Sequence, residues 1–273
     1  MWKLIKMDLY RLGSGKAIKF AALVSCLVSA GAMAIFLGIV VLCRAAFSQD
    51  PSVAIALGEA FPCVGWMAGA NLSDIIFTGT GAFSLFVGCM LCASFIGSEQ
   101  SCGYAKNFAG QLPNRGYMAI SKFIVTSIAQ VVILLIYVIV SAVCGKLFFN
   151  QYITGFDVPG LLSALGLRVM LHIAINAIIF FLCTLTKSHA IAMVAGSIFG
   201  LGITHIAYMS IGMVLKIAKI NVEIGNYMPD GINVQLTLQS VNELWVKAIV
   251  VSVVCTAVFL FADYILLKRR DVK

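Results

Sequence analysis

Three residues able to bind ligands or carry charge recur at helical spacing in one apolar stretch of the chain. Arg168, His172 and Asn176 are four residues apart, which places them on one face of an α-helix. An Arg at the centre of a membrane helix costs about 2.5–3.5 kcal/mol, so such residues usually face protein or water. Two interpretations are open. The stripe lines a polar path or a chain–chain interface, or Arg168 reaches outward while the other two bond neighbouring helices.

Residues suited to catalysis occur without the partners that catalysis needs. Ser197 and His205 are eight residues apart on one predicted helix, about 12 Å and beyond hydrogen-bond reach. The segment 13–16 evokes a phosphate-binding loop, but Tyr10 and Ala17 occupy positions where that motif requires Gly and Ser or Thr. The metalloprotease pattern H-E-x-x-H is absent. We therefore predict no catalytic residue, no metal ligand and no ATP site, and hence no enzyme.

Other reactive side chains favour structural roles. Cys89 and Cys92 form a C-x-x-C pair inside an apolar stretch, where Cys acts as a small hydrophobe and a metal would need further ligands. Asp263 lies about one turn from the basic cluster 268–270, which predicts a local charge pair. Gln130 and His205 receive no predicted role.

Six apolar stretches must position these residues. They cover residues 20–43, 75–97, 123–145, 161–186, 190–215 and 248–267, and none is shorter than the roughly 20 residues that cross a bilayer. With 61% hydrophobic and 11% charged residues, the chain lies far outside the soluble norm of about a quarter charged. We predict an all-α, polytopic membrane protein with six transmembrane helices in one domain, residues 1–273.

The basic residues predict the orientation of these spans. With the N-terminus inside, 13 of the 19 Lys and Arg face the cytoplasm, five face outward and Arg168 lies within a span, as the positive-inside rule requires. Both termini are then cytoplasmic. The net charge of +8 attracts anionic membrane lipid, and no basic patch with interleaved aromatics indicates nucleic acid. The first span is too long for a cleaved signal peptide.

Shorter elements flank the spans. Trp2, Ile5, Leu9 and Leu12 recur at helical intervals, which predicts an interfacial N-terminal helix on the cytoplasmic leaflet. The external segment 44–74 is predicted to be irregular, and its role is not readable. Short external helices are predicted at about 212–224 and 233–244, before the last span. Spans four and five form an antiparallel hairpin, and the G-x-x-x-G of span five favours packing within the chain over a dimer seam.

The longest predicted cytoplasmic loop, residues 97–122, has an informative order of residues. The order predicts a compact helical elbow. It begins with an acid at the membrane exit and a Gly, continues with a helix-compatible run that contains a Lys, and ends with a Pro-containing turn with an Arg and a Lys at re-entry. These residues are Glu99, Gly103, Lys106, Pro113, Arg115 and Lys122.

The chain resembles the permeases of type 2 ABC exporters. The resemblance rests on this loop, the six spans, the N-terminal interfacial helix and the external helices before the last span. The resemblance covers essentially the whole chain, with Asn114 departing where a small or hydroxyl residue is common. It implies two cytosolic ATPase subunits that bind ATP and Mg, since this chain holds no cofactor, and a second permease chain, identical or a sister. Segment 99–116 is then the coupling helix, and Glu99, Lys106 and Arg115 dock the ATPase or fix the elbow.

The resemblance leaves the substrate open. The length without a large external domain favours an amphipathic peptide, such as a lantibiotic or peptide toxin, or a hydrophobic antibiotic. Abundant Cys and the lack of a periplasmic module favour the plasma membrane of a Gram-positive bacterium. The alternatives are a secondary transporter, for which discontinuous helices or paired acids at mid-membrane are expected, and a membrane immunity or scaffold protein that acts without an ATPase.

Overall fold

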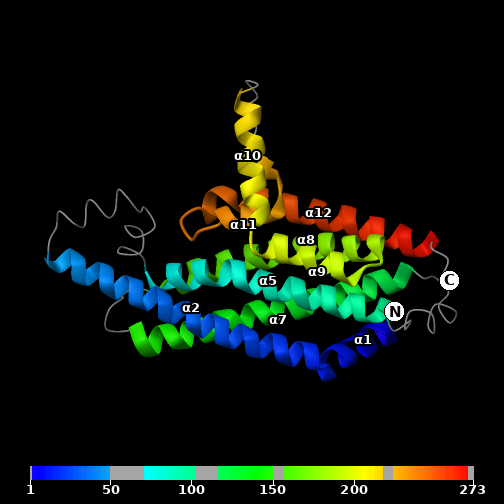
Figure 1. Cartoon of the computed structure of the whole chain (residues 1–273), viewed down its shortest axis with the longest axis horizontal. Coiled ribbons are helices and arrows are strands. Elements are labelled where there is room, and N and C mark those ends of the chain that lie inside the picture. Colours follow the sequence, from blue (N-terminus) through cyan, green and yellow to red (C-terminus); the bar gives the residue numbers. More distant parts are fainter. Residues whose placement is uncertain (1, 50–70, 102–115, 150–155, 218–223, 270–273) are drawn as a thin grey trace.

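The computed structural model describes residues 2–49, 71–101, 116–149, 156–217 and 224–269 (Figure 1), and these contain helices and no strand. The coupling-loop residues Gly103, Lys106, Pro113 and Arg115 lie outside the described residues. The helices are α1 Trp2–Ser14, α2 Lys16–Gln49, α5 Leu72–Ser101, α7 Gly116–Phe149, α8 Val158–Thr186, α9 His189–Gly200, α10 Ile203–Ile217, the 3₁₀-helix η1 Ile224–Tyr227, α11 Pro229–Gln235 and α12 Val241–Arg269.

Five long helices form the bundle. Helices α2, α5, α7, α8 and α12 are each long and apolar enough to cross a membrane, and α9 with α10 makes a sixth candidate if that bent pair is one span. The five run side by side in the long direction of the molecule (Figure 1). The prediction of an all-helical chain with several membrane-spanning helices is confirmed at this level.

Helix α5 is the centre of the bundle. In its most apolar window 73% of residues are buried, against 11% for α12, and α5 packs on α2, α7, α8 and α9. The outer faces of α2, α7 and α12 instead expose large apolar side chains such as Leu27, Leu135 and Phe261. This arrangement suits helices that meet lipid on one side and protein on the other.

The N-terminal helix is present, and it buries Asp8 together with Leu12, the last residue of the predicted apolar stripe. Helix α1 ends at Ser14, and Gly15 begins the turn into α2 by donating to the carbonyls of Arg11 and Leu12. Asp8 and Leu12 are buried, while Trp2 is 77% exposed. The apolar stripe at Trp2 and Leu9 therefore faces away from the protein, and a carboxylate faces inward.

The turn between spans four and five is tight, as predicted. Helix α8 ends where Lys187 adopts left-handed backbone angles (φ 54°) and donates its N–H to the carbonyl of Cys183. Ser188 then caps α9 by accepting a hydrogen bond from Ile191 N–H. The two helices contact each other after this turn, and α9 also packs on α5.

The prediction of one continuous fifth span, 190–215, is wrong. The helix breaks after Gly200, and α10 continues at 68° to α9, so that α10 points away from the bundle (Figure 1). Gly202 occupies φ +71°, a conformation that glycine adopts without strain. A Cβ on Gly200 would come within 2.5 Å of Phe86 Cα, so this glycine permits close contact with α5. The G-x-x-x-G pair therefore packs within the chain.

Of the two external helices predicted before the last span, the first, at 212–224, overlaps the end of α10 and otherwise lies largely outside the described residues, and the second lies elsewhere than predicted. The expected piece at 233–244 is absent, since α11 ends at Gln235 and α12 begins at Val241. Pro229 occupies the first turn of α11, where its missing N–H costs nothing. Helix α11 is buried against α8, α12 and α5, with Ile232 in an apolar cluster with Phe77 and Leu167. It dips into the bundle rather than lying on it.

Candidate functional site

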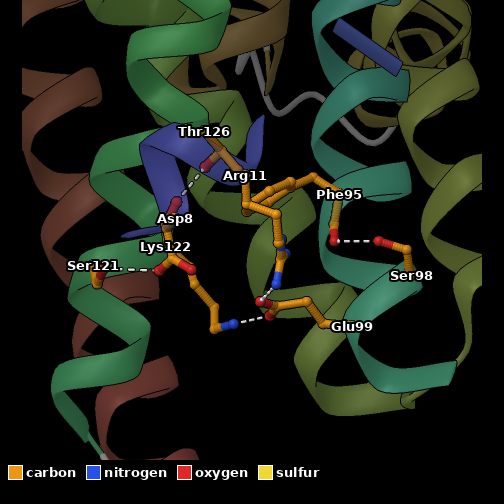
Figure 2. A network of polar contacts seen from close by, with 8 residues as sticks. All are labelled: Asp8, Arg11, Phe95, Ser98, Glu99, Ser121, Lys122 and Thr126. Carbon is orange, nitrogen blue, oxygen red and sulfur yellow. Dashed lines mark hydrogen bonds and ion pairs between the residues drawn. The ribbon is translucent and has the colours of Figure 1, made fainter. Parts of the chain in front are cut away.

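A cluster of charged residues joins three helices at the end of the bundle that holds α1 (Figure 2). Glu99, near the C-terminus of α5, forms ion pairs with Arg11 of α1 and Lys122 of α7. The side chains of Glu99 and Lys122 are 4% and 8% exposed. Both Glu99 oxygens are engaged, one by each cation.

Two further contacts hold α1 in place. Ser121 donates a hydrogen bond to Asp8 at 2.9 Å, and both residues are buried. The guanidinium of Arg11 lies 4.3 Å from the centroid of the Phe95 ring, within the range of a cation–π interaction. The cluster thus contains two acids and two bases, so its formal charges balance. Because buried charges are stable only when paired, this balance is what allows the cluster to lie inside the protein.

The cluster lies at both ends of the predicted coupling segment. Glu99 is two residues before the end of α5 at Ser101, and Gly116 is the first residue of α7. A side chain at Gly116 would collide with the ring of Tyr264 in α12, so the start of α7 is packed closely on α12. Any load on residues 102–115 would therefore reach α1, α5, α7 and α12 together. Glu99 is 4% exposed, so its carboxylate is not available at the surface of the bundle.

The α8 stripe predicted from the sequence faces the interior of the bundle. Arg168, His172 and Asn176 are at most 2% exposed. The Arg168 guanidinium donates to the carbonyl of Phe77, and to that of Leu236 at 3.4 Å, and it lies 3.6 Å from the Phe77 ring centroid. Arg168 therefore does not reach outward to the membrane surface.

The other two members of the stripe bond to α7. Gln130 donates its side-chain amide to His172 Nδ1 at 3.2 Å. Asn176 donates to Thr126 Oγ1 at 3.0 Å and to Ser127 Oγ at 3.3 Å. Lys122, Thr126 and Gln130 are themselves spaced by four residues, so a polar face of α7 matches the stripe of α8. Gly88 of α5 leaves the space that the Gln130 amide fills.

Several buried atoms of this polar interior have no hydrogen-bond partner among the described residues. They are His172 Nε2, Gln130 Oε1 and Asn176 Oδ1. Buried polar groups of native proteins are nearly always bonded to protein or ordered water. The interior between α7 and α8 is therefore a place where water or a polar ligand would be stabilised.

Asp263 has a partner on another helix and is not paired with Lys268; the side chains of residues 269 and 270, also in the predicted pair, lie outside the described part. The Asp263 side chain is fully buried and accepts a hydrogen bond from Thr184 of α8, whereas Lys268 is exposed. The bond joins α12 to α8 at the α1 end of the bundle. A buried carboxylate between two helices is a different environment from the headgroup-level pair that its spacing indicated.

The remaining candidate residues from the sequence make packing contacts or hydrogen bonds within the bundle. Cys89 and Cys92 are buried on α5, with Cys89 against Gly196 of α9. Ser197 donates to the carbonyl of Met193 within its own helix. The described ranges contain no group of three or more His, Cys, Asp or Glu arranged to hold a metal ion.

Four residues of these polar clusters were missed by sequence reasoning. Asp8 and Arg11 are three residues apart on α1, a spacing that puts both on one side of a helix. This signal was available, but the stronger apolar period obscured it. Asp230 and Asn233, both buried on α11, have the same spacing, in a segment that the sequence predicted to be external.

No known protein-family model matches the chain, and no curated protein matches its sequence. The class is therefore defined by the fold: several long apolar helices, packed side by side with a polar interior, are typical of a multi-pass helical membrane protein.

Proposed function

We propose that this chain is the membrane-spanning permease subunit of an ATP-driven exporter. Two separate cytosolic ATPase subunits bind ATP and Mg, and a second permease chain completes the assembly. The chain lies in the plasma membrane with both termini in the cytoplasm. Its substrate is an amphipathic peptide or a hydrophobic antibiotic, and the Arg168, His172 and Asn176 stripe contributes to the substrate path.

The charge cluster around Glu99 is the observation that supports this proposal best. A coupling segment has to transmit force from a soluble motor into the membrane helices, and it does so only if both its ends are fixed to them. Glu99 precedes residues 102–115, and it is ion-paired to α1 and to the first turns of α7. ATP-driven closure of the ATPases would then shift the bundle from one conformation to another. The size of this shift is limited by the difference between the free energies with which the ATPases bind the two conformations.

Affinity purification of the full chain tests this proposal. The tagged chain, isolated from its native membrane, is expected to recover a soluble ATPase. Replacing residues 102–115 by a Gly/Ser linker of equal length should abolish recovery, and the same replacement of 14 residues within 50–70 should not. If the ATPase is absent, or is retained by the 102–115 replacement, the exporter proposal is wrong.

A specific observation favours the second candidate, a secondary transporter. The break between α9 and α10, with the buried acid Asp230 beside it, is a discontinuous helix of the kind such transporters use to bind ions and substrates. Proteoliposomes that contain this chain alone separate the two candidates. Substrate accumulation driven by a proton or sodium gradient would support the secondary transporter, and accumulation that requires ATP and the ATPase would support the exporter.

A further inference from the structure

A cavity of about 280 Å³ lies beside the break between α9 and α10. Its wall comes from α5, α8, the α9–α10 junction and α11, and it includes Arg168, Asp230, Asn233 and His205. In an otherwise apolar bundle, ionisable residues around a cavity are the usual mark of a binding site. The exposed side chains of Ile206 and Val234 belong to the same wall, so the cavity has an entrance.

Arg168 supplies a positive group that is held in position. Its guanidinium bonds the carbonyls of Phe77 and Leu236 and stacks on the Phe77 ring. Gly81 lies against it, and a Cβ at that position would be 3.1 Å from the guanidinium carbon. A planar, fixed guanidinium is preorganised to bind a carboxylate or a phosphate group.

Asp230 supplies a negative group on the same wall. Asp230 is 2% exposed. Its carboxylate accepts hydrogen bonds from Thr204 and, at 3.2 Å, from Tyr208. A carboxylate has about four acceptor positions, so these two bonds leave capacity for a further donor. Thr204 and Tyr208 belong to α10, so they hold Asp230 between α10 and α11.

Asn233 supplies a neutral polar side chain on the same wall. It is 95% buried, and its Oδ1 has no hydrogen-bond partner in the described part of the chain. The imidazole of His172 is close enough to interact with the Asn233 side chain, so these two buried polar groups face each other at the wall of the cavity.

From the cavity and the two charged groups of its wall we propose that it binds a small zwitterion. Its anionic group, a carboxylate or phosphate, binds at Arg168, and its ammonium group binds at Asp230. The wall carries one base and one acid, so a ligand with one charge of each sign is complementary to both. The volume is at the lower end of ligand pockets, about 300–1,000 Å³. It admits an amino acid, a dipeptide or a lipid headgroup, and excludes a whole peptide substrate. This inference does not depend on an ATPase partner.

Equilibrium binding of radiolabelled Leu-Leu to the purified full chain tests the inference. The chain is reconstituted in phosphatidylglycerol nanodiscs, because that lipid has no ammonium group. We expect saturable binding, with competition by N-acetyl-Leu-Leu and by Leu-Leu-amide each at least about tenfold weaker, since each lacks one charged contact. Saturable binding of radiolabelled phosphoethanolamine, with no saturable binding of Leu-Leu, would identify a lipid headgroup as the source of the same chemistry.

Two variants assign the two charges. Arg168→Gln should lower Leu-Leu affinity about tenfold and leave Leu-Leu-amide binding unchanged. Asp230→Asn should also lower Leu-Leu affinity about tenfold, and it should leave N-acetyl-Leu-Leu binding unchanged. Val234→Phe fills the cavity without removing a charge and should abolish binding. Its matched control is Val250→Phe at an exposed position of α12. Gel filtration checks that each variant is folded, and Val234→Phe and Asp230→Asn carry the test if Arg168→Gln does not fold.

The inference is overturned by any of three results on folded protein. These are the absence of saturable binding by both Leu-Leu and phosphoethanolamine, which would leave a cavity filled by water alone; equal competition by the doubly blocked N-acetyl-Leu-Leu-amide; and binding unchanged in Val234→Phe. Recovery or loss of an ATPase in the purification experiment affects none of them.

Discussion

Neutralising Glu99 should destabilise the protein through Lys122. In Glu99→Gln the cluster retains two bases and one acid, and Lys122, whose side chain is 8% exposed, loses the carboxylate that it contacts. Breaking a buried ion pair from one side costs about 3–5 kcal/mol. Arg11 is 28% exposed and can be rehydrated, so it adds less than about 1 kcal/mol. A loss of about 3–5 kcal/mol is large against a typical total stability of 5–15 kcal/mol.

The double variant Glu99→Gln/Lys122→Met makes this prediction specific. It restores the charge balance, with Asp8 and Arg11 as the remaining acid and base. Its unfolding free energy should therefore lie above that of Glu99→Gln alone, with a coupling energy of about 2–3 kcal/mol. The assay is unfolding by increasing SDS mole fraction in mixed micelles, followed by circular dichroism.

Glu243→Gln, at an exposed position near the start of α12, is the matched control and should change stability by less than about 0.5 kcal/mol. The reasoning is refuted if Glu99→Gln matches this control, or if the effects of Glu99→Gln and Lys122→Met simply add.

Three further predictions use the same unfolding assay. Gly88→Ala should cost about 1–3 kcal/mol because its Cβ would overlap the Gln130 amide, whereas Gly31→Ala, with open space around it, should be tolerated; equal effects would contradict the packing of α7 on α5. Thr184→Val should cost about 1–3 kcal/mol because it leaves the buried Asp263 carboxylate without its donor, and Ser163→Ala at an exposed position should not; a neutral Thr184→Val would show that the bond between α8 and α12 does not form. Gly202→Ala should destabilise the protein by about 1 kcal/mol because position 202 has a positive φ. The control is Gly166→Ala, in open space on α8, which should be tolerated like Gly31→Ala. Unchanged stability in Gly202→Ala would argue against the break after α9.

The long helices could be predicted from sequence because hydrophobicity accumulates over 20 or more residues. Helices α5 and α7 extend beyond the predicted spans at both ends. Helix α8 begins before its predicted start and ends at the predicted Thr186. The break within span five could not be found in this way, since Gly200 and Gly202 leave the stretch apolar. Only the contact of Gly200 with Phe86 and the positive φ of Gly202 reveal it.

The polar residues divide in the same manner. The spacing of Arg168, His172 and Asn176 predicted one shared face, and the structure places all three in the interior. Their partners come from other helices, as with Gln130 of α7 and Phe77 of α5. Periodicity within one helix carries no information on such pairs. For the same reason Asp263 was assigned to a neighbour in its own helix, while its partner is Thr184 of α8.

The most direct test of the account is the sidedness of the segment between α5 and α7. A single cysteine at position 104, in a variant without the other cysteines, is labelled with a membrane-impermeant maleimide in right-side-out and in inverted membrane vesicles. Lys247→Cys, at the opposite end of the bundle, is the control. We predict labelling at position 104 only in inverted vesicles and at position 247 only in right-side-out vesicles. Labelling of position 104 from the outside would contradict the proposal, because a cytosolic ATPase could not reach that segment.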